Sequence, residues 1–373
     1  MNGQRILAIL IKEFIQLTRD RLTYAMILAI PVIQLMLFGY AVNGNPRHLP
    51  AAVLMQDHGI MSRSVISAMR NTSYFDFVLN ARSPDELDQA LKRGDIQLAI
   101  TIPSDFSRRV VRGDDAQVLV EADASDPTAT GQALAAVEGL AATALQNDLK
   151  GALAGVAPRQ PFQFVVHSRY NPENITAYNI VPGLLGIVLT MTLVMMTALA
   201  LTRERERGTM ETLLATPVLP LEVMIGKLAP YVGIGLVQTG LILLLAKLLF
   251  HVPFMGGWGA LAVGVALFIT GSLSLGFLFS TLAKSQLQAM QMSVFYILPS
   301  ILLSGFLFPF RGMPGWAQVI GTAIPVTHFL RVVRGALLKG VGMDQTWPSL
   351  VALTIFVAVV AGLAMARYRT TLD

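Results

Sequence analysis

The sequence contains no cysteine and few charged side chains. Cysteine is absent from all 373 residues, which excludes disulfide bonds, thiolate metal sites and cysteine nucleophiles. Charged residues make up only 14% of the chain, whereas soluble domains average about 25%. Hydrophobic residues reach 54%, and the mean hydropathy is +0.59. This composition is typical of an integral membrane protein and not of a soluble domain.

Signatures of nucleotide, metal and covalent chemistry are missing as well. The chain has no GxxxxGK[ST] segment to wrap phosphate groups, so it does not bind ATP through a P-loop. Its five histidines are scattered, and no HExxH or comparable ligand cluster is present. The formal net charge of +5 comes from basic residues beside apolar segments, which indicates membrane orientation and not nucleic-acid binding. We predict a chain that is not an enzyme by itself and binds no cofactor.

Long apolar segments predict a polytopic α-helical membrane protein. Six of them approach the ~20 residues that a helix needs to cross a bilayer. They cover 22–42, 178–201, 223–250, 258–282, 287–309 and 347–366. The first could instead be a secretory signal, with Gly39-Tyr40-Ala41 as its cleavage site. Its apolar run exceeds the usual 7–15 residues, however, and a long amphipathic segment precedes it, so we predict a span.

The distribution of lysine and arginine predicts which side each loop faces. With the N-terminus in the cytoplasm, eleven of these residues flank cytoplasmic span ends and five flank the opposite ends, leaving out the large loop 43–177. Cytoplasmic loops carry the excess of positive charge in membrane proteins. We therefore predict an N-in, C-in protein with a cytoplasmic tail at 367–373. The five exceptions are Lys247, Arg311, Arg331, Arg334 and Lys339.

Residues 1–21 show helical periodicity before the first span. Leu7, Leu10, Ile11 and Phe14 recur at helical spacing, opposite a polar face. This pattern predicts an amphipathic helix that lies on the cytoplasmic membrane surface. An ordinary cytosolic extension of the first span is the alternative.

The loop 43–177 is more polar and has the pattern of a small domain. Strand-like runs alternate with helix-like runs, and Ser83-Pro84-Asp85-Glu86 opens one helix as a capping box. This alternation predicts a small α/β domain inserted between spans one and two, on the extracytoplasmic side. Its carboxylates and histidines form no catalytic set, so we interpret them as solvated side chains and the domain as a docking or gating unit. The residues concerned are Asp57, His58, Asp123, Asp126 and His167.

The predicted spans contain almost no ionisable residue in their interiors. Proton-coupled carriers usually bury carboxylates or histidines at mid-membrane, so this pattern argues against ion coupling. Gln288 and Gln291 are three residues apart on one helix and could face a shared cavity. Gln34 of the first span is a further candidate for such a cavity. Hydrogen bonding between helices is the alternative role for these glutamines.

The loop 310–346 is too interrupted by glycine and proline to cross the membrane. After Pro325 the sequence predicts a helix with His328, Arg331 and Arg334 on one face at three-residue steps. Two interpretations remain. The helix can lie in the outer headgroup layer with its cations on lipid phosphates. It can also belong to a re-entrant hairpin whose basic face lines the exit of a transport path.

The cytoplasmic loop 202–222 has a strong local pattern. Gly208 ends the preceding helix, and Thr209 can cap a short new one. Glu211 falls in the first turn of that helix, where the helix dipole favours a negative charge. Leu213 and Leu214 give the short helix an apolar side. Such a capped helix indicates a docking element for another protein.

Two segments resemble those of a known family. The first, Arg203-Glu204-Arg205-Glu206-Arg207-Gly208-Thr209-Met210-Glu211-Thr212-Leu213, resembles the R-E-x-x-x-G-T-x-E-x-L signature of ABC-2-type transporter permeases. The second runs from Pro325 through His328, Arg331 and Arg334, and it is similar to the family's element before the last span. The six-span layout with a large external domain resembles the bacterial exporter subset, so the resemblance covers essentially the whole chain.

The resemblance implies one half of a type V ABC exporter in the bacterial inner membrane. Two permeases, identical or paralogous, would bind two cytosolic ATPase subunits, which hold the ATP and magnesium. The interfacial helix and the loop 202–222 would dock on those ATPases, where Glu204, Glu206 and Glu211 could pair with basic groups. A periplasmic adaptor protein and membrane lipids are further expected partners. The exported compound would be amphipathic or hydrophobic, such as a drug or a lipid.

Two other functions stay open at this point. An ion-coupled secondary transporter would use the same spans without an ATPase, although the uncharged interiors count against it. A membrane sensor would use the external domain to bind a ligand. It would be expected to carry a signalling output domain, and only a few residues follow the last predicted span.

Overall fold

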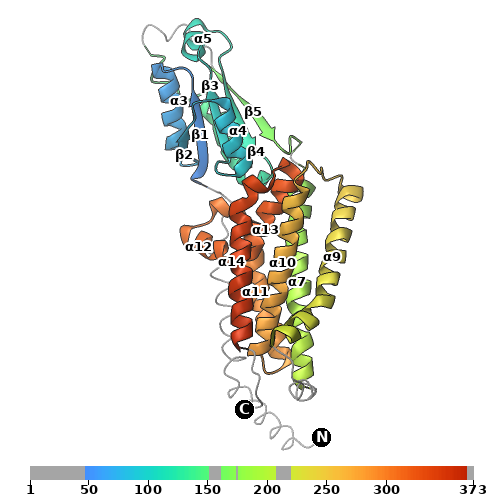
Figure 1. Ribbon diagram of the computed structural model, residues 1–373. Coiled ribbons are helices and arrows are strands. Elements are labelled where there is room, and N and C mark those ends of the chain that lie inside the picture. Colours follow the sequence, from blue (N-terminus) through green and yellow to red (C-terminus); the bar gives the residue numbers. More distant parts are fainter. Residues whose placement is uncertain (1–46, 151–160, 174, 207–219, 368–373) are drawn as a thin grey trace, which may run out of the picture.

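The computed structural model describes residues 47–150, 161–173, 175–206 and 220–367, which form an α/β domain at one end of a helical bundle (Figure 1). Several predicted features lie outside these residues. They are the interfacial helix with Leu7, Leu10, Ile11 and Phe14, the first span with Gln34, the loop residues Gly208, Thr209, Glu211 and Leu213, and the end of the tail.

The α/β domain is built on a five-stranded mixed sheet. Its strands are β1 (Leu49–Met55), β2 (Phe75–Asn80), β3 (Leu98–Ile102), β4 (Gln117–Asp123) and β5 (Gln163–Arg169). The order is β2-β1-β3-β4-β5, and only the β3–β4 pair is antiparallel. The inner strand β1 is an apolar run that is buried on both faces, as expected for a strand covered on both sides. The edge strand β2 alternates in burial along its length.

Helices cover both faces of this sheet. On one face, α3 (Ile60–Asn71), α5 (Phe106–Arg112) and α6 (Pro127–Leu140) pack into one apolar core. On the other face, α4 (Pro84–Arg93) packs Leu87 and Leu91 against Ala52 and Ala99. The predicted cap of α4 is present, because Ser83 Oγ accepts a hydrogen bond from the Glu86 amide at 3.3 Å. The domain therefore has three layers, and α4 is the layer that meets the bundle.

Five long apolar helices make up most of the bundle. They are α7 (Thr176–Glu206), α9 (Pro220–Phe250), α10 (Trp258–Leu282), α11 (Gln286–Leu303) and α14 (Met343–Arg367). All five contain a stretch long and apolar enough to cross a membrane. The range of α10 is the one that the sequence predicts, whereas α11 ends before the predicted 309. It ends there because the chain turns at Gly305, whose φ of 84° lies in the left-handed region that favours glycine.

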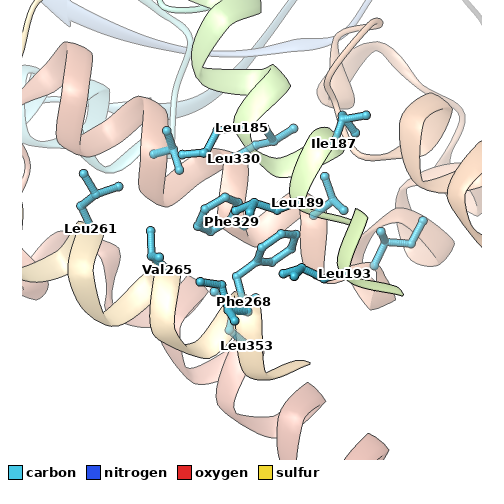
Figure 2. Packing of buried hydrophobic residues seen from close by; sticks show 14 of the residues in the cluster. Leu185, Ile187, Leu189, Leu193, Leu261, Val265, Phe268, Phe329, Leu330 and Leu353 are labelled. Carbon is cyan, nitrogen blue, oxygen red and sulfur yellow. The ribbon is translucent and has the colours of Figure 1, made fainter. Parts of the chain in front are cut away.

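Four shorter elements sit between α11 and α14. A 3₁₀ turn (Phe310–Gly312) leads into α12 (Gly315–Ala323), then α13 (Pro325–Arg334) continues into a π-helical turn, Gly335–Lys339. Figure 2 shows Phe329 and Leu330 of α13 among apolar side chains of α7, α10 and α14. The Phe268 and Phe329 rings stack with their centroids 4.1 Å apart. The helix α13 thus occupies the centre of the bundle, at the end that carries the α/β domain (Figure 1).

The helix α9 stands at the edge of the bundle (Figure 1). It contacts α7 and α10, while many of its large apolar side chains remain exposed. The exposed set includes Leu236, Val237, Leu241, Leu244, Leu248 and Leu249. In a membrane, an apolar face of this kind lies against lipid chains or against another protein helix.

Candidate functional site

The helix α13 is enclosed by protein on its apolar side. Pro325 occupies the first turn, where its missing amide and fixed φ suit a helix start. Val326, Phe329 and Val333 have no exposed surface. The apolar face of α13 packs against the bundle, and the two interpretations of this segment, which do not exclude each other, stay predictions. The neighbouring α12 instead exposes apolar side chains, including Val319 at 71%.

A cavity of about 270 Å³ lies between α13, the start of α14 and the α/β domain. Its walls come from segments far apart in the sequence. The domain contributes the end of α4 and the end of β4, and the bundle contributes the Gly305 turn, α13 and the π-helical turn. The lining includes nine charged residues: Lys92, Arg93, Asp95, Asp123, Asp126, Arg311, Arg331, Arg334 and Lys339.

Arg334 is the most enclosed of the arginines around this cavity. Its Nη1 donates a hydrogen bond to the Gly305 carbonyl at 3.1 Å. Its Nε and Nη2 are buried and have no hydrogen-bond partner among the described residues. A guanidinium has five donors, so this side chain, which also lines the cavity, keeps unused hydrogen-bonding capacity.

The other predicted residues of α13 have separate environments. Arg331 is more exposed, and its guanidinium lies over the Phe310 ring at 5.0 Å from the centroid, a cation–π contact. His328 is not part of the cavity lining, and its Nε2 lies 2.8 Å from the Thr322 carbonyl of α12. The structure therefore brings Arg331 and Arg334 to one cavity and uses His328 to hold α12 and α13 together.

A buried ion pair joins the bundle to the α/β domain. Lys339, at the end of the π-helical turn, pairs with Asp123 at the end of β4, and their side chains are only 8% and 9% exposed. Lys339 Nζ also donates to the Leu91 carbonyl at 3.3 Å and lies 5.1 Å from the Tyr170 ring centroid. The prediction that Asp123 is solvated is wrong, because Lys339 and Ser125 hold its carboxylate inside the junction.

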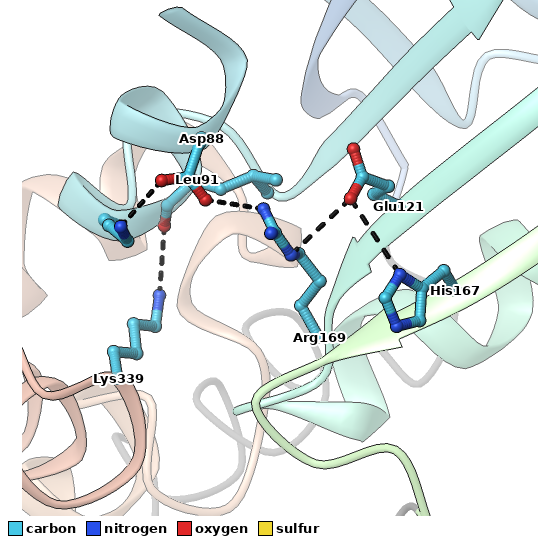
Figure 3. A network of polar contacts seen from close by, with 7 residues as sticks. Asp88, Leu91, Glu121, His167, Arg169 and Lys339 are labelled. Carbon is cyan, nitrogen blue, oxygen red and sulfur yellow. Dashed lines mark hydrogen bonds and ion pairs between the residues drawn. The ribbon is translucent and has the colours of Figure 1, made fainter. Parts of the chain in front are cut away.

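A second polar network continues along the domain side of this junction. Figure 3 shows Arg169 of β5 between Asp88 of α4 and Glu121 of β4. The Arg169 Nη1–Asp88 distance is 2.6 Å, the Arg169 Nε–Glu121 distance is 3.5 Å, and Lys92 also pairs with Asp88 at 2.6 Å. Burial raises the pKa of the Asp88 carboxyl, but Lys92 and Arg169 outweigh it and hold that pKa below its usual value. These ion pairs fix β4, β5 and α4 relative to one another.

The tyrosine beside Lys339 stays protonated. Burial raises the pKa of the Tyr170 hydroxyl, and the nearby Asp123 carboxylate raises it further. Its ring therefore offers Lys339 a neutral aromatic face. On α7, Asn179 Nδ2 donates to Asp126 at 3.4 Å and adds another contact between domain and bundle.

At the opposite end of the bundle, the end of α7 is tied to the start of α11. Glu206 accepts hydrogen bonds from the backbone and the side chain of Gln286, the former at 2.7 Å. Hydrogen bonds from the Gln286 side chain and backbone lower the pKa of the Glu206 carboxyl. Arg203, one helical turn earlier, is exposed. The prediction that Glu204, Arg205 and Glu206 meet an ATPase stays a prediction, since no partner chain is present.

The two described glutamines of the predicted cavity set differ from each other. The Gln288 side-chain oxygen accepts a hydrogen bond from the Lys284 backbone amide at 2.9 Å. The Gln288 backbone amide donates to Ser285 Oγ at the start of α11. The Gln291 side-chain oxygen is buried without a hydrogen-bond partner among the described residues. Within the described ranges, no three histidine or carboxylate side chains gather as a metal site would require.

Comparison with known proteins identifies the family. The sequence model of the ABC-2 family transporter proteins matches residues 21–366. The chain belongs to the ABC-2 transporter family. It is 27% identical to the probable multidrug ABC transporter permease YbhR of Escherichia coli, over 98% of both chains. It is also 29% identical to YbhS, with the same description, over 91% of this chain and 90% of that protein.

A third relative is the E. coli inner membrane transport permease YhhJ, 28% identical over 97% of this chain and 96% of that protein. The matches extend over the α/β domain and the bundle together, so the family covers the whole described architecture. This chain is therefore a multi-pass membrane protein and a membrane subunit of an ABC transporter.

Sequence reasoning missed the partnership of Lys339 with Asp123 and the role of Gly305. One signal was available for the lysine, because it belongs to the five cations that depart from the positive-inside pattern. No periodicity could have linked it to Asp123, which lies 216 positions earlier.

Proposed function

We propose that this chain is the permease of an ABC exporter that moves an amphipathic or hydrophobic compound out across the inner membrane. The observation that carries the proposal is a pairing of two facts. The chain belongs to a transporter family over nearly its whole length, and it contains no GxxxxGK[ST] segment that could hold ATP. The energy must therefore come from ATPase subunits on separate polypeptides, which carry the ATP and magnesium.

The assembly follows from the same reasoning. A second permease, identical or paralogous, completes the path, and the loop 202–222 with the helix of residues 1–21 docks on the ATPases. The multidrug descriptions of YbhR and YbhS support an amphipathic drug-like compound as the substrate class. The α/β domain offers a surface for a periplasmic adaptor.

Within this proposal, α13 forms the wall of the exit. Support comes from its place at the domain end of the bundle, where Arg331 and Arg334 line the junction cavity. A compound that leaves between the helices must pass this end of the bundle.

Dye accumulation in intact cells tests the proposal. Cells that make this permease with its ATPase should retain less of a fluorescent amphipathic dye than cells with an ATPase variant that binds but does not hydrolyse ATP. Equal retention in the two strains would contradict ATP-driven export. A protonophore should leave the difference in place, and its loss while cellular ATP is held constant would indicate an ion-coupled carrier.

A further inference from the structure

Positive charge exceeds negative charge around the cavity between the α/β domain and the bundle. Six basic and three acidic side chains line it. Lys92 pairs with Asp88, and Lys339 pairs with Asp123. The four lining arginines form no ion pair with another described residue. They are Arg93, Arg311, Arg331 and Arg334.

The acidic side chains at the cavity are too few to balance its basic ones. Asp123 is already engaged by Lys339 and by the Ser125 hydroxyl at 2.7 Å. Asp126 accepts a hydrogen bond from Asn179, and its carboxylate, like that of Asp123, attracts the Arg334 guanidinium. Asp95 lies on the domain side of the lining. An excess of arginine charge therefore remains on the bundle side.

Arg334 supplies the strongest evidence that this cavity binds a ligand. Two of its nitrogens, Nε and Nη2, are buried without a hydrogen-bond partner among the described residues. Buried donors are satisfied in the great majority of native structures, because an unpaired one loses its hydration without replacement. An oxygen-rich group bound at the cavity would supply acceptors for this guanidinium after a small side-chain adjustment.

The residue types point to the chemistry of that group. Arginine presents planar pairs of donors that match the oxygens of a phosphate, and it keeps its charge in enclosed sites. A phosphate has enough oxygens to meet more than one guanidinium at once. The cavity volume of about 270 Å³ is also several times the roughly 30 Å³ of one water molecule, so a phosphate ester has room.

We propose that the junction cavity binds a phosphate group, held mainly by Arg334 and Arg331. The group is either the headgroup of a phospholipid that enters from the bilayer or a phosphate free in solution. Both sources offer the same oxygens to the two guanidinium groups. Binding at this cavity requires neither an ATPase nor transport. The phosphate site can therefore be tested independently of the proposed function.

Calorimetric titration of the purified full-length chain in an uncharged detergent tests the site. The probes are dihexanoyl phosphatidylglycerol, inorganic phosphate, and dihexanoylglycerol, which has the same acyl chains without phosphate. We expect the phosphatidylglycerol to bind whether or not inorganic phosphate competes with it. The dihexanoylglycerol should bind at least tenfold more weakly than the phosphatidylglycerol. Competition by inorganic phosphate would assign the free source, and its absence would assign the headgroup.

Three variants make the test specific. Arg334→Gln should weaken binding at least tenfold, and Arg334→Lys should weaken it less, because one charge-assisted contact remains. Arg112→Gln removes one cation from an exposed position on α5, at the far end of the domain, and should bind like the parent within twofold (Figure 1). If Arg334→Gln does not fold, the exposed Arg331→Gln takes its place, with an expected loss of at least threefold.

The proposal is overturned by any of four results. The parent chain could bind neither phosphate probe, or it could bind dihexanoylglycerol as tightly as phosphatidylglycerol. The folded Arg334 and Arg331 variants could also bind like the parent, or Arg112→Gln could lose as much affinity as they do. Melting temperature gives an independent reading, since a bound probe should raise it for the parent and not for Arg334→Gln.

Discussion

Lys339 and Asp123 lie 216 positions apart in the sequence and form a buried ion pair between the bundle and the α/β domain. One partner ends the π-helical turn after α13, and the other ends β4. Movement of α13 relative to the domain must therefore strain or break this pair. Irregular helical turns of this kind are frequent at functional sites.

Removing one member of the pair should be strongly destabilising. In Lys339→Met the Asp123 carboxylate stays buried without its cation. We therefore expect the free energy of unfolding to fall by about 3–5 kcal/mol. The double variant Lys339→Met with Asp123→Asn leaves no buried charge and should recover part of that loss. Chemical unfolding of the full chain in detergent measures both effects, and hydrogen exchange at Gly335–Lys339 shows where the opening occurs.

Lys92→Met is the matched control for this pair. Lys92 also pairs with an aspartate, Asp88, but its side chain is 41% exposed. Solvent-exposed pairs contribute about 0–1 kcal/mol, so this variant should stay close to the parent. An equal loss of unfolding free energy in Lys92→Met and Lys339→Met would contradict the claim that the buried pair contributes more to stability than the exposed one.

Close helix packing in the bundle depends on one glycine of α10. A methyl group at Gly276 would lie 2.6 Å from the Val194 carbonyl oxygen of α7, which is too close for the backbones to keep their positions. Gly276→Ala should therefore cost about 1–3 kcal/mol, as overpacking does. Gly233→Ala on α9 has open space and should be neutral in the same unfolding assay. A stable Gly276→Ala protein would show that α7 and α10 pack less closely.

Local sequence signals predicted much of the element pattern. The helix range 258–282, the strand pattern of the domain and the cap at Ser83 all follow from apolar periodicity and cap chemistry, which act within a few residues. The predicted end of α11 was wrong because apolar residues continue past Leu303, whereas the chain turns at Gly305, whose positive φ favours glycine.

The cavity could be predicted only in part. The three-residue spacing of Arg331 and Arg334 predicted that both lie on one face of a helix. That this face and the end of α4 line the same cavity depends on tertiary structure. The prediction for Asp123 failed for the same reason. A carboxylate at a strand end is solvated unless another segment covers it, and here the π-helical turn does so.

The α/β domain should lose stability in acid through Asp57. Burial raises the pKa of this carboxyl, but hydrogen bonds from Ser107, including its amide at 2.7 Å, and from Gly59 outweigh burial and lower it to about 2. A lowered pKa gives stability that is present above the unfolded value of 3.8 and is lost as pH falls toward 2. After allowance for the partial exposure of Asp57, we expect its carboxylate to contribute about 1–2 kcal/mol to the free energy of unfolding.

Asp57→Asn separates this effect from general acid unfolding. The variant should be less stable than the parent at pH 7, and the difference should shrink between pH 4 and pH 2. Near-ultraviolet circular dichroism of the full chain follows the transition. A difference that stays constant over this range would rule out the Asp57 carboxylate as its source.

The glutamates of the loop 202–222 should couple ATP hydrolysis to export. Replacing Glu204 and Glu211 with alanine should leave membrane insertion intact while hydrolysis by the ATPase no longer drives dye efflux. Glu138→Ala, which removes an exposed carboxylate from α6, is the matched control and should export normally. Normal efflux by the double variant would contradict the coupling role.

Reconstitution of the purified chain tests its role as the membrane subunit of an ATP-driven exporter most directly. Proteoliposomes are prepared with the chain alone, with its ATPase alone and with both, and ATP hydrolysis and movement of an amphipathic dye are measured together. We predict no hydrolysis from the chain alone and ATP-dependent dye movement only when both are present. Hydrolysis by the chain alone, or dye movement driven by a proton gradient without ATP, would contradict this role.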